Sequence, residues 1–260
     1  GSEYIERAVE LDPDQALLRT QLAVGRIGAG DTASAISQLE SAVALGQDVV
    51  QADVLLVLSY LNKKEFDKAI SASEALEQRM ADSPIPYNLT GLAFLAQRKF
   101  EAADARFRLA LEKDPEFVVA QMNLARLALV QQKLDLAANA YQEVLKLDSK
   151  HVGAMMGLAA LARARNEPDE AESWLLKANE ANPQALQPTL LLAEMYLRNN
   201  EGLKANNMLS GLTPAQAELP AVLRLKGMAQ LQTGDYASAM HTLKKLTEQH
   251  PSLMEGWFQL

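Results

Sequence analysis

Three histidines, His151, His241 and His250, are the side chains best suited to bind a metal ion or to move a proton near neutral pH. They fall at unrelated phases of the repeat described below, so nothing in their spacing brings three metal ligands together. The carboxylates cluster in charged stretches such as residues 112–116 and 167–172, which are typical of solvent-facing surfaces. The chain has no cysteine, and neither a glycine-rich phosphate loop nor a Ser/His/Asp grouping can be derived from the spacing. We therefore expect no catalytic, cofactor-binding or metal site, and a protein that is not an enzyme.

The composition favours a helical protein that does not bind nucleic acid. Alanine and leucine, both strong helix formers, dominate the sequence, whereas glycine and proline are too sparse for an all-β protein with many tight turns. The formal net charge of −8 repels a phosphate backbone, and no run of lysine and arginine offsets it. The longest uncharged run, residues 83–97, is too short to cross a membrane and contains two prolines, so we expect no transmembrane segment.

The chain repeats itself every 34 residues. Seven alanines fall at this interval without any insertion or deletion, at Ala35, Ala69, Ala103, Ala137, Ala171, Ala205 and Ala239. A column of small residues lies twelve positions before them, at Ala23, Val57, Gly91, Ala125, Ala159, Ala193 and Gly227. A column of mostly large residues lies four positions after them, at Leu39, Ser73, Phe107, Tyr141, Leu175, Leu209 and Leu243. A constant period of this kind predicts a stack of similar structural units.

Each unit contains two apolar-periodic segments separated by a short cluster of turn residues, such as GAGDTAS or TGDY. Proline follows the second segment in several units, where it ends a helix. The unit is therefore predicted to be helix, tight turn, helix and a second turn. We expect the small residue on the first helix to face the alanine on the second, because two helix backbones can approach closely only where side chains are small.

The period and its columns resemble the tetratricopeptide pattern over nearly the whole chain. The resemblance implies an all-α fold, a right-handed superhelical α-solenoid of antiparallel helix pairs. Seven repeats would cover residues 16–253, starting at residues 16, 50, 84, 118, 152, 186 and 220. A partial repeat would occupy residues 1–15, and residues 254–260 would begin a truncated further repeat, with Trp257 at a position where the family favours tryptophan. The alternative, a generic antiparallel helix bundle, has no need for a constant period.

In this family the first helix of each repeat lines the concave side, which implies a groove that binds a peptide or a helix. Its fifth and ninth positions are mainly apolar, with methionines at the centre, and methionine suits an adaptable binding surface. The alternative is that these side chains only pack between neighbouring first helices. The candidate groove residues are Val54, Leu58, Asn88, Leu92, Met122, Asn123, Arg126, Met156, Leu190, Glu194, Arg224 and Met228.

Some members of the family hold the terminal carboxylate of a peptide with a set of lysine, asparagine and arginine side chains on successive first helices. This chain has Thr20, Val54 and Leu58 at the early positions of that set. We therefore do not expect a receptor for chaperone tails.

Several segments are similar to one particular group, the tetratricopeptide lipoproteins that accompany PEP-CTERM protein-sorting and exopolysaccharide loci in Gram-negative bacteria. The similarity is carried by NLTGLAFLAQ, DPEFVVAQMNLARL and AESWLLKANEANPQALQPTLLLAEMYLR. It implies a scaffold for polysaccharide export or surface-protein sorting. It also implies a periplasmic location with an N-terminal lipid anchor in the full-length protein, and a cytoplasmic location is the alternative.

Two other functions stay open from the sequence. A self-assembling structural module would associate end to end, because a stack that starts with a lone second helix and stops within a first helix leaves uncapped apolar ends. An accessory domain of a larger envelope enzyme or secretion complex would leave the chemistry to other parts of the chain, since we expect this sequence to be a piece of a longer protein. The identity of the protein or peptide partner does not follow from the sequence.

Overall fold

The computed structural model describes residues 2–47 and 49–250 of the chain. The described residues form sixteen helices and no strand, as the composition and periodicity predict. The truncated repeat predicted at residues 254–260, with Trp257, lies outside the described residues. The chain divides into two compact units, Gly1–Ala140 and Tyr141–Leu260, which are described in turn.

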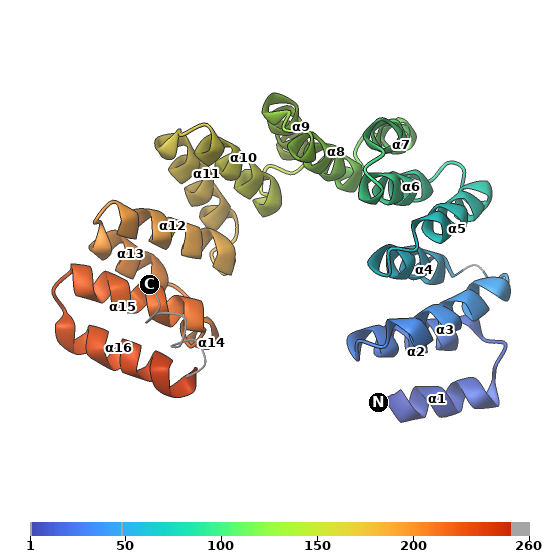
Figure 1. Cartoon of the computed structure of the whole chain (residues 1–260), viewed down its shortest axis with the longest axis horizontal. Coiled ribbons are helices and arrows are strands. Elements are labelled where there is room, and N and C mark those ends of the chain that lie inside the picture. Colours follow the sequence, from blue (N-terminus) through green and yellow to red (C-terminus); the bar gives the residue numbers. More distant parts are fainter. Residues whose placement is uncertain (1, 48, 251–260) are drawn as a thin grey trace. The chain divides into compact units, whose positions relative to one another are not determined.

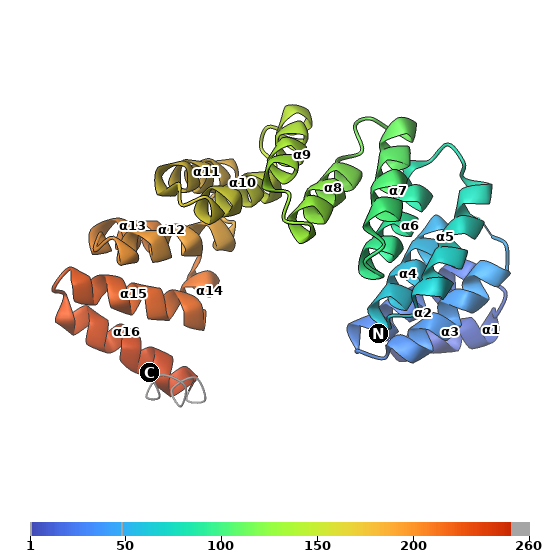
Figure 2. The same ribbon diagram turned by 45° about the horizontal axis from the view of Figure 1, so that its top comes forward.

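The first unit is a succession of helices in which each helix from α1 to α7 packs against the next along the chain, for example α2 on α3, α4 on α5 and α6 on α7 (Figures 1 and 2). This alternation of first and second helices is the stacked arrangement of an α-solenoid. The helices are α1 (Ser2–Leu11), α2 (Ala16–Gly28), α3 (Thr32–Ala44), α4 (Val50–Asn62), α5 (Phe66–Arg79), α6 (Pro84–Ala96), α7 (Phe100–Lys113), α8 (Val118–Val130) and the first half of α9 (Leu134–Leu147).

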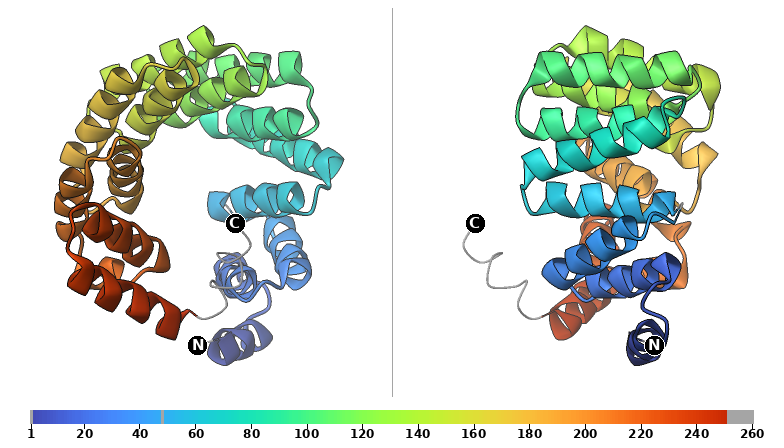
Figure 3. Two further views of the ribbon diagram at one scale, coloured as in Figure 1. Left: turned by 60° about the vertical axis from the view of Figure 1, so that its left-hand side comes forward. Right: turned by 90° about the vertical axis from the view of Figure 1, so that its right-hand side faces the viewer.

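The second unit repeats the same arrangement, with α10 on α11, α12 on α13 and α15 on α16 (Figure 3). It contains the second half of α9, α10 (Val152–Ala164), α11 (Pro168–Ala181), α12 (Leu186–Arg198), α13 (Gly202–Ser210), α14 (Pro214–Ala217), α15 (Pro220–Gln232) and α16 (Tyr236–Gln249). The second helix of the sixth repeat departs from the pattern. It stops at Ser210, and Thr213 then caps a short new helix, α14, that begins at Pro214. Proline at this first helical position is tolerated, whereas inside a continuous helix it would remove a hydrogen bond.

The turn inside each repeat has one repeated geometry. The residue after the first helix's C-cap has a positive φ at 34-residue intervals, at Gly30, Lys64, Arg98, Gln132, Asn166, Asn200 and Gly234. The backbone N–H of the following residue donates to a carbonyl five residues earlier, as Lys99 does to Phe94 at 2.9 Å. This left-handed closure satisfies carbonyl groups at the helix end and reverses the chain direction. It is the local reason why two helices become an antiparallel pair.

The second helices differ in how they begin. The carboxylates of Asp31 and Asp235 each accept a hydrogen bond from a backbone N–H three residues on, at 3.1 Å, and thereby cap α3 and α16. Hydrogen bonds from Ser34 hold the pKa of Asp31 below its ordinary value; the bond from the Ser34 side chain has the larger effect and the bond from its backbone the smaller. Lys99 occupies the same position before α7 and gives no side-chain cap.

Replacing Lys99 by aspartate is expected to stabilise the protein by about 1 kcal/mol, because it supplies the missing cap and places a negative charge at a helix N-terminus. The measurement is the free energy of unfolding from chemical denaturation. Lys99→Ala is the matched control, because it removes the same ammonium group without adding a cap. An equal gain in both variants would contradict the capping explanation.

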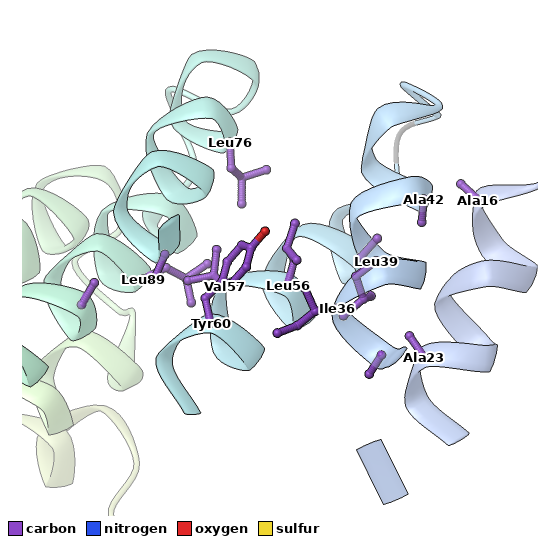
Figure 4. Close-up of a cluster of buried hydrophobic side chains, with 14 residues drawn as sticks. Ala16, Ala23, Ile36, Leu39, Ala42, Leu56, Val57, Tyr60, Leu76 and Leu89 are labelled. Atoms are coloured by element: carbon purple, nitrogen blue, oxygen red, sulfur yellow. The ribbon is translucent and has the colours of Figure 1, made fainter. Parts of the chain in front are cut away.

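The buried core follows the repeat columns. In the first unit, Ile36 and Leu39 of α3 and Leu56 of α4 lie together in one cluster with alanines of α2 (Figure 4). The repeat alanines 35, 69, 103, 137, 171, 205 and 239 are all fully buried. The column of large residues is buried too where it carries Leu39, Phe107, Leu175 and Leu209.

At the two glycines of the small column, the nearest neighbours of an added side chain belong to the column of large residues, and the predicted contact with the alanine column stays a prediction. A Cβ atom on Gly91 would lie 2.6 Å from the ring of Phe107, and one on Gly227 would lie 2.5 Å from Cδ2 of Leu243. In these two repeats the glycine of the first helix therefore faces the large residue of the second helix, one turn beyond the repeat alanine. The two helices approach where the first has no side chain, and the large side chain of the second fills that space.

Candidate binding surface

The candidate groove residues of the first unit differ widely in exposure. Leu58 at the ninth position of its repeat is 42% exposed, and Val24 at the same position of the preceding repeat is 45% exposed. Val54, Leu92 and Met122 are partly buried. The ninth positions of α2 and α4 therefore present large apolar side chains to the outside.

Asn88 is placed differently from its neighbours in the candidate set. It is only 5% exposed, and its Oδ1 accepts a hydrogen bond of 2.8 Å from Nδ2 of Asn123 on the next first helix. This amide pair links α6 to α8, so it holds two neighbouring repeats in register. Arg126, which follows Asn123 on α8, is exposed.

A small hollow lies beside the exposed apolar residues of α2. It encloses about 290 Å³ and is lined by Ile5 of α1, Leu17, Thr20, Gln21 and Val24 of α2, and Gln51 of α4. Leu17 was missed by the choice of fifth and ninth positions, although it precedes Thr20 by three residues and so shares its helix face.

In the second unit the candidate residues form a mixed surface. Arg224 of α15 pairs with Glu194 of α12 at 3.3 Å, and its Nη1 lies 3.8 Å from Sδ of Met228. Met228 is 38% exposed, while Met156 and Leu190 are partly buried. Glu194 and Arg224 thus neutralise each other across two repeats.

A larger pocket of about 540 Å³ lies between α10, α11 and α12. None of its lining residues belongs to the candidate set. Arg163 and Arg198 carry its positive charge, and they lie one helical turn beyond Ala160 and Glu194, which are both ninth positions. The lining residues are Ala160, Arg163, Ala164, Asn166, Glu167, Pro168, Met195, Arg198 and Asn199.

The repeat geometry agrees with a comparison against protein families. The tetratricopeptide repeat model matches residues 20–84, 88–138 and 123–186, which together make up more than half of the chain. The chain belongs to the tetratricopeptide repeat (TPR) family. No curated protein matches the sequence of this TPR protein. The PEP-CTERM group therefore stays a prediction.

Several solved structures share its fold. Yeast Tom70 aligns with a TM-score of 0.70 and 17% identity over 95% of this chain and 54% of Tom70. Human IFIT1, solved as a dimer with m7Gppp-AAAA, aligns with a TM-score of 0.65 and 19% identity over 94% of this chain and 57% of IFIT1. The thermophilic TPR protein TTC0263 of Thermus thermophilus aligns with a TM-score of 0.58 and 19% identity over 70% of this chain and 99% of its own. This TPR protein spans little more than half the length of Tom70 and IFIT1, and at these identities the likeness shows the fold alone.

The histidines of this TPR protein lie at helix ends or on the surface. Nδ1 of His151 accepts a hydrogen bond of 3.0 Å from the backbone N–H of Ala154, so this side chain caps α10. His241 is exposed on α16, and His250 is the residue after the end of that helix. Within residues 2–47 and 49–250, no group of three histidine or acidic side chains could hold a metal ion. None of the described helices is both long enough and apolar enough to cross a membrane.

The most perturbed titratable groups of this TPR protein are structural tyrosines. Burial, together with a hydrogen bond of 2.8 Å to Glu172, raises the pKa of Tyr196 to about 12. Burial and a hydrogen bond to Glu40 likewise raise the pKa of Tyr60. Each hydroxyl lies on a first helix and reaches a glutamate on the second helix of the preceding repeat, so both tie successive repeats together.

Proposed function

We propose that this TPR protein is a non-catalytic scaffold that holds a peptide or a helix of a partner protein against its first helices. The observation that carries the proposal is the exposure of large apolar side chains at the ninth position of first helices, Val24 and Leu58 in the first unit and Met228 in the second. Val24 and Leu58 lie on two helices in contact, α2 and α4, and exposed apolar side chains that gather on one surface usually mark an interaction site. The TPR fold is itself typical of interaction scaffolds.

The proposed setting is an envelope machinery for exopolysaccharide export or PEP-CTERM protein sorting. Support comes from the similarity of residues 88–97, 114–127 and 171–198 to lipoproteins of those loci. A protein of that group would work in the periplasm, held to a membrane by an N-terminal lipid. Within each unit, the first-helix surface that carries the candidate residues is part of this proposal.

Site-specific photocrosslinking in the cell of origin tests the scaffold function. A photoreactive phenylalanine analogue at Leu58 or at Met228 is expected to yield discrete adducts with the same partner protein. Leu203 of α13 is the matched control, because it is an even more exposed apolar side chain but lies on a second helix. Adducts at Leu203 together with none at Leu58 and Met228 would place the binding surface on the second helices and contradict the proposal.

Self-assembly is a second candidate function, favoured by exposed large side chains on the first and last described helices. Tyr4 and Leu11 of α1 and Tyr236 and Met240 of α16 are largely exposed. Light scattering at increasing protein concentration distinguishes the two functions. A scaffold keeps a constant mass, whereas end-to-end assembly raises the mass with concentration.

A further inference from the structure

We infer that the pocket between α10, α11 and α12 binds the side-chain carboxylate of a glutamate or aspartate in the partner segment. This inference rests on the proposed scaffold function and deepens it, because it names the chemistry of one recognised side chain. The pocket belongs entirely to the second unit and is built by two successive repeats.

The pocket contains two arginine side chains that can bind an anion. Arg163 of α10 and Arg198 of α12 both line it, and among the described residues neither guanidinium forms an ion pair. By contrast, Arg224 on the same unit is paired with Glu194, and Arg106 of the first unit with Glu77. In a chain with 33 acidic and 25 basic side chains, two arginines that line one pocket and form no ion pair, although Glu167 also lines it, are available for an external anion. A planar guanidinium binds a carboxylate with two parallel hydrogen bonds.

The charge balance selects a single negative charge. Glu167 also lines the pocket, so two guanidinium groups and one carboxylate leave a net charge of about +1. One carboxylate neutralises this charge. A phosphate with nearly two negative charges would leave an excess beside Asp169 and Glu170 in the first turn of α11. The formal net charge of −8 on the whole chain opposes a nucleic-acid backbone.

The remaining lining fits the rest of an amino-acid side chain and its backbone. Ala160, Ala164, Pro168 and Met195 supply apolar atoms for methylene groups, and the amides of Asn166 and Asn199 can donate hydrogen bonds or accept them. The volume of about 540 Å³ falls within the range of sites that enclose small ligands. The turn fixes Asn166 in a left-handed conformation, with φ 61°, so this part of the wall is preorganised.

The position of the pocket favours a side chain over a chain terminus. Arg163 and Arg198 each lie one helical turn beyond a ninth-position residue, on the same helix faces as the proposed binding surface. A segment lying along those faces would pass the pocket and could place an acidic side chain in it while its backbone continues. Because the pocket is positively charged, the segment that binds it is an acidic segment of a separate protein.

The test is a titration of the full 260-residue chain with N-acetyl-glutamate N-methylamide at low salt. The readout is the NMR signals of the arginine Nε–H groups and of the Asn166 and Asn199 side-chain amides. We expect saturable shifts of the Arg163 and Arg198 signals and none with the uncharged glutamine analogue. Arg198→Gln is expected to weaken binding at least tenfold. Arg7→Gln removes an equal charge from an exposed position on α1 and is expected to leave binding unchanged.

Each other outcome overturns the inference. Equal binding of the glutamine analogue would exclude charge recognition, and equal binding to Arg198→Gln would exclude this pocket. Tighter binding of N-acetyl-alanine, which has only a terminal carboxylate, would indicate a chain terminus. Tighter binding of a blocked phosphoserine would indicate a phosphate site. All of these leave the crosslinks at Leu58 and Met228 unaffected, whereas absent crosslinks with intact carboxylate binding would refute the scaffold function alone.

Discussion

Gly91→Ala is expected to destabilise the protein by about 2–3 kcal/mol, at the upper end of the range for overpacked cores. The new methyl group would lie 2.6 Å from two ring carbons of Phe107, whose side chain is fully buried. Free energies of unfolding from denaturant titrations, followed by circular dichroism, provide the measurement. Gly25→Ala is the matched control, because nothing lies within 4 Å of its added Cβ atom. That change is expected to stabilise α2 by about 0.5–1 kcal/mol, because alanine has the higher helix propensity.

A double-mutant cycle shows whether the ring of Phe107 is the cause. Phe107→Leu alone removes buried atoms and is expected to cost about 1–2 kcal/mol. Combined with Gly91→Ala, it creates an alanine and leucine pair. Ala159 and Leu175 already form this combination at the same two positions of another repeat. The loss of unfolding free energy in the double variant should therefore be smaller, by at least about 1 kcal/mol, than the sum of the losses in the two single variants. Strict additivity would show that Gly91 and Phe107 do not compete for the same space.

The two columns complement each other in size along the chain. Gly91, the smallest type in its column, stands opposite phenylalanine, whereas Val57, the largest, belongs to the repeat in which the other column carries Ser73. Val57 and Ser73 are both fully buried. The spacing of these columns was readable from the sequence. The close approach of Gly91 to Phe107 was not, because the sequence gives positions along each helix but not the register between two helices.

The sequence predicted the helix face of the candidate residues but not how deeply each of them is buried. Leu58 and Asn88 both occupy predicted groove positions, yet the leucine is exposed and the asparagine is buried against Asn123. Helical periodicity places a residue on a face, but the depth of burial depends on how closely the next helix packs. Arg163 and Arg198 were overlooked because they lie at the twelfth and thirteenth positions of their repeats. They meet in one pocket only because the ends of two first helices lie beside the same turn.

The break between α13 and α14 illustrates a local signal that was present but unused. Thr213 and Pro214 are a typical helix start, with an N-cap hydroxyl and proline at the first helical position. The 34-residue period favoured a full second helix in that repeat, and the period continues unchanged at Pro220. The strong long-range pattern therefore concealed the interruption within the second helix of this repeat.

Arg79→Leu is expected to destabilise the protein by about 3 kcal/mol. Asp53, on the first helix of the second repeat, forms an ion pair with Arg79 at the end of the second helix of that repeat. The carboxylate side chain is only 6% exposed, whereas the arginine side chain is 40% exposed. Removing the guanidinium takes the positive charge of Arg79 away from a buried carboxylate, which costs more than losing a surface ion pair. Denaturant titration measures the change, and Arg108→Leu is the control.

Arg108 pairs with Asp104 within one helix, and both side chains are well exposed, at 64% and 40%, so its loss is expected to cost under about 1 kcal/mol. A second variant tests whether the buried charge of Asp53 causes the loss of stability. Adding Asp53→Asn to Arg79→Leu removes the buried charge and should restore about 1–2 kcal/mol, although it changes a second native residue. Restoration of this kind would separate the cost of a buried charge from the lost packing of the arginine stem. If the second change instead lowers stability further, the carboxylate of Asp53 must be held by other contacts, and the pair does not join the two helices through its charge.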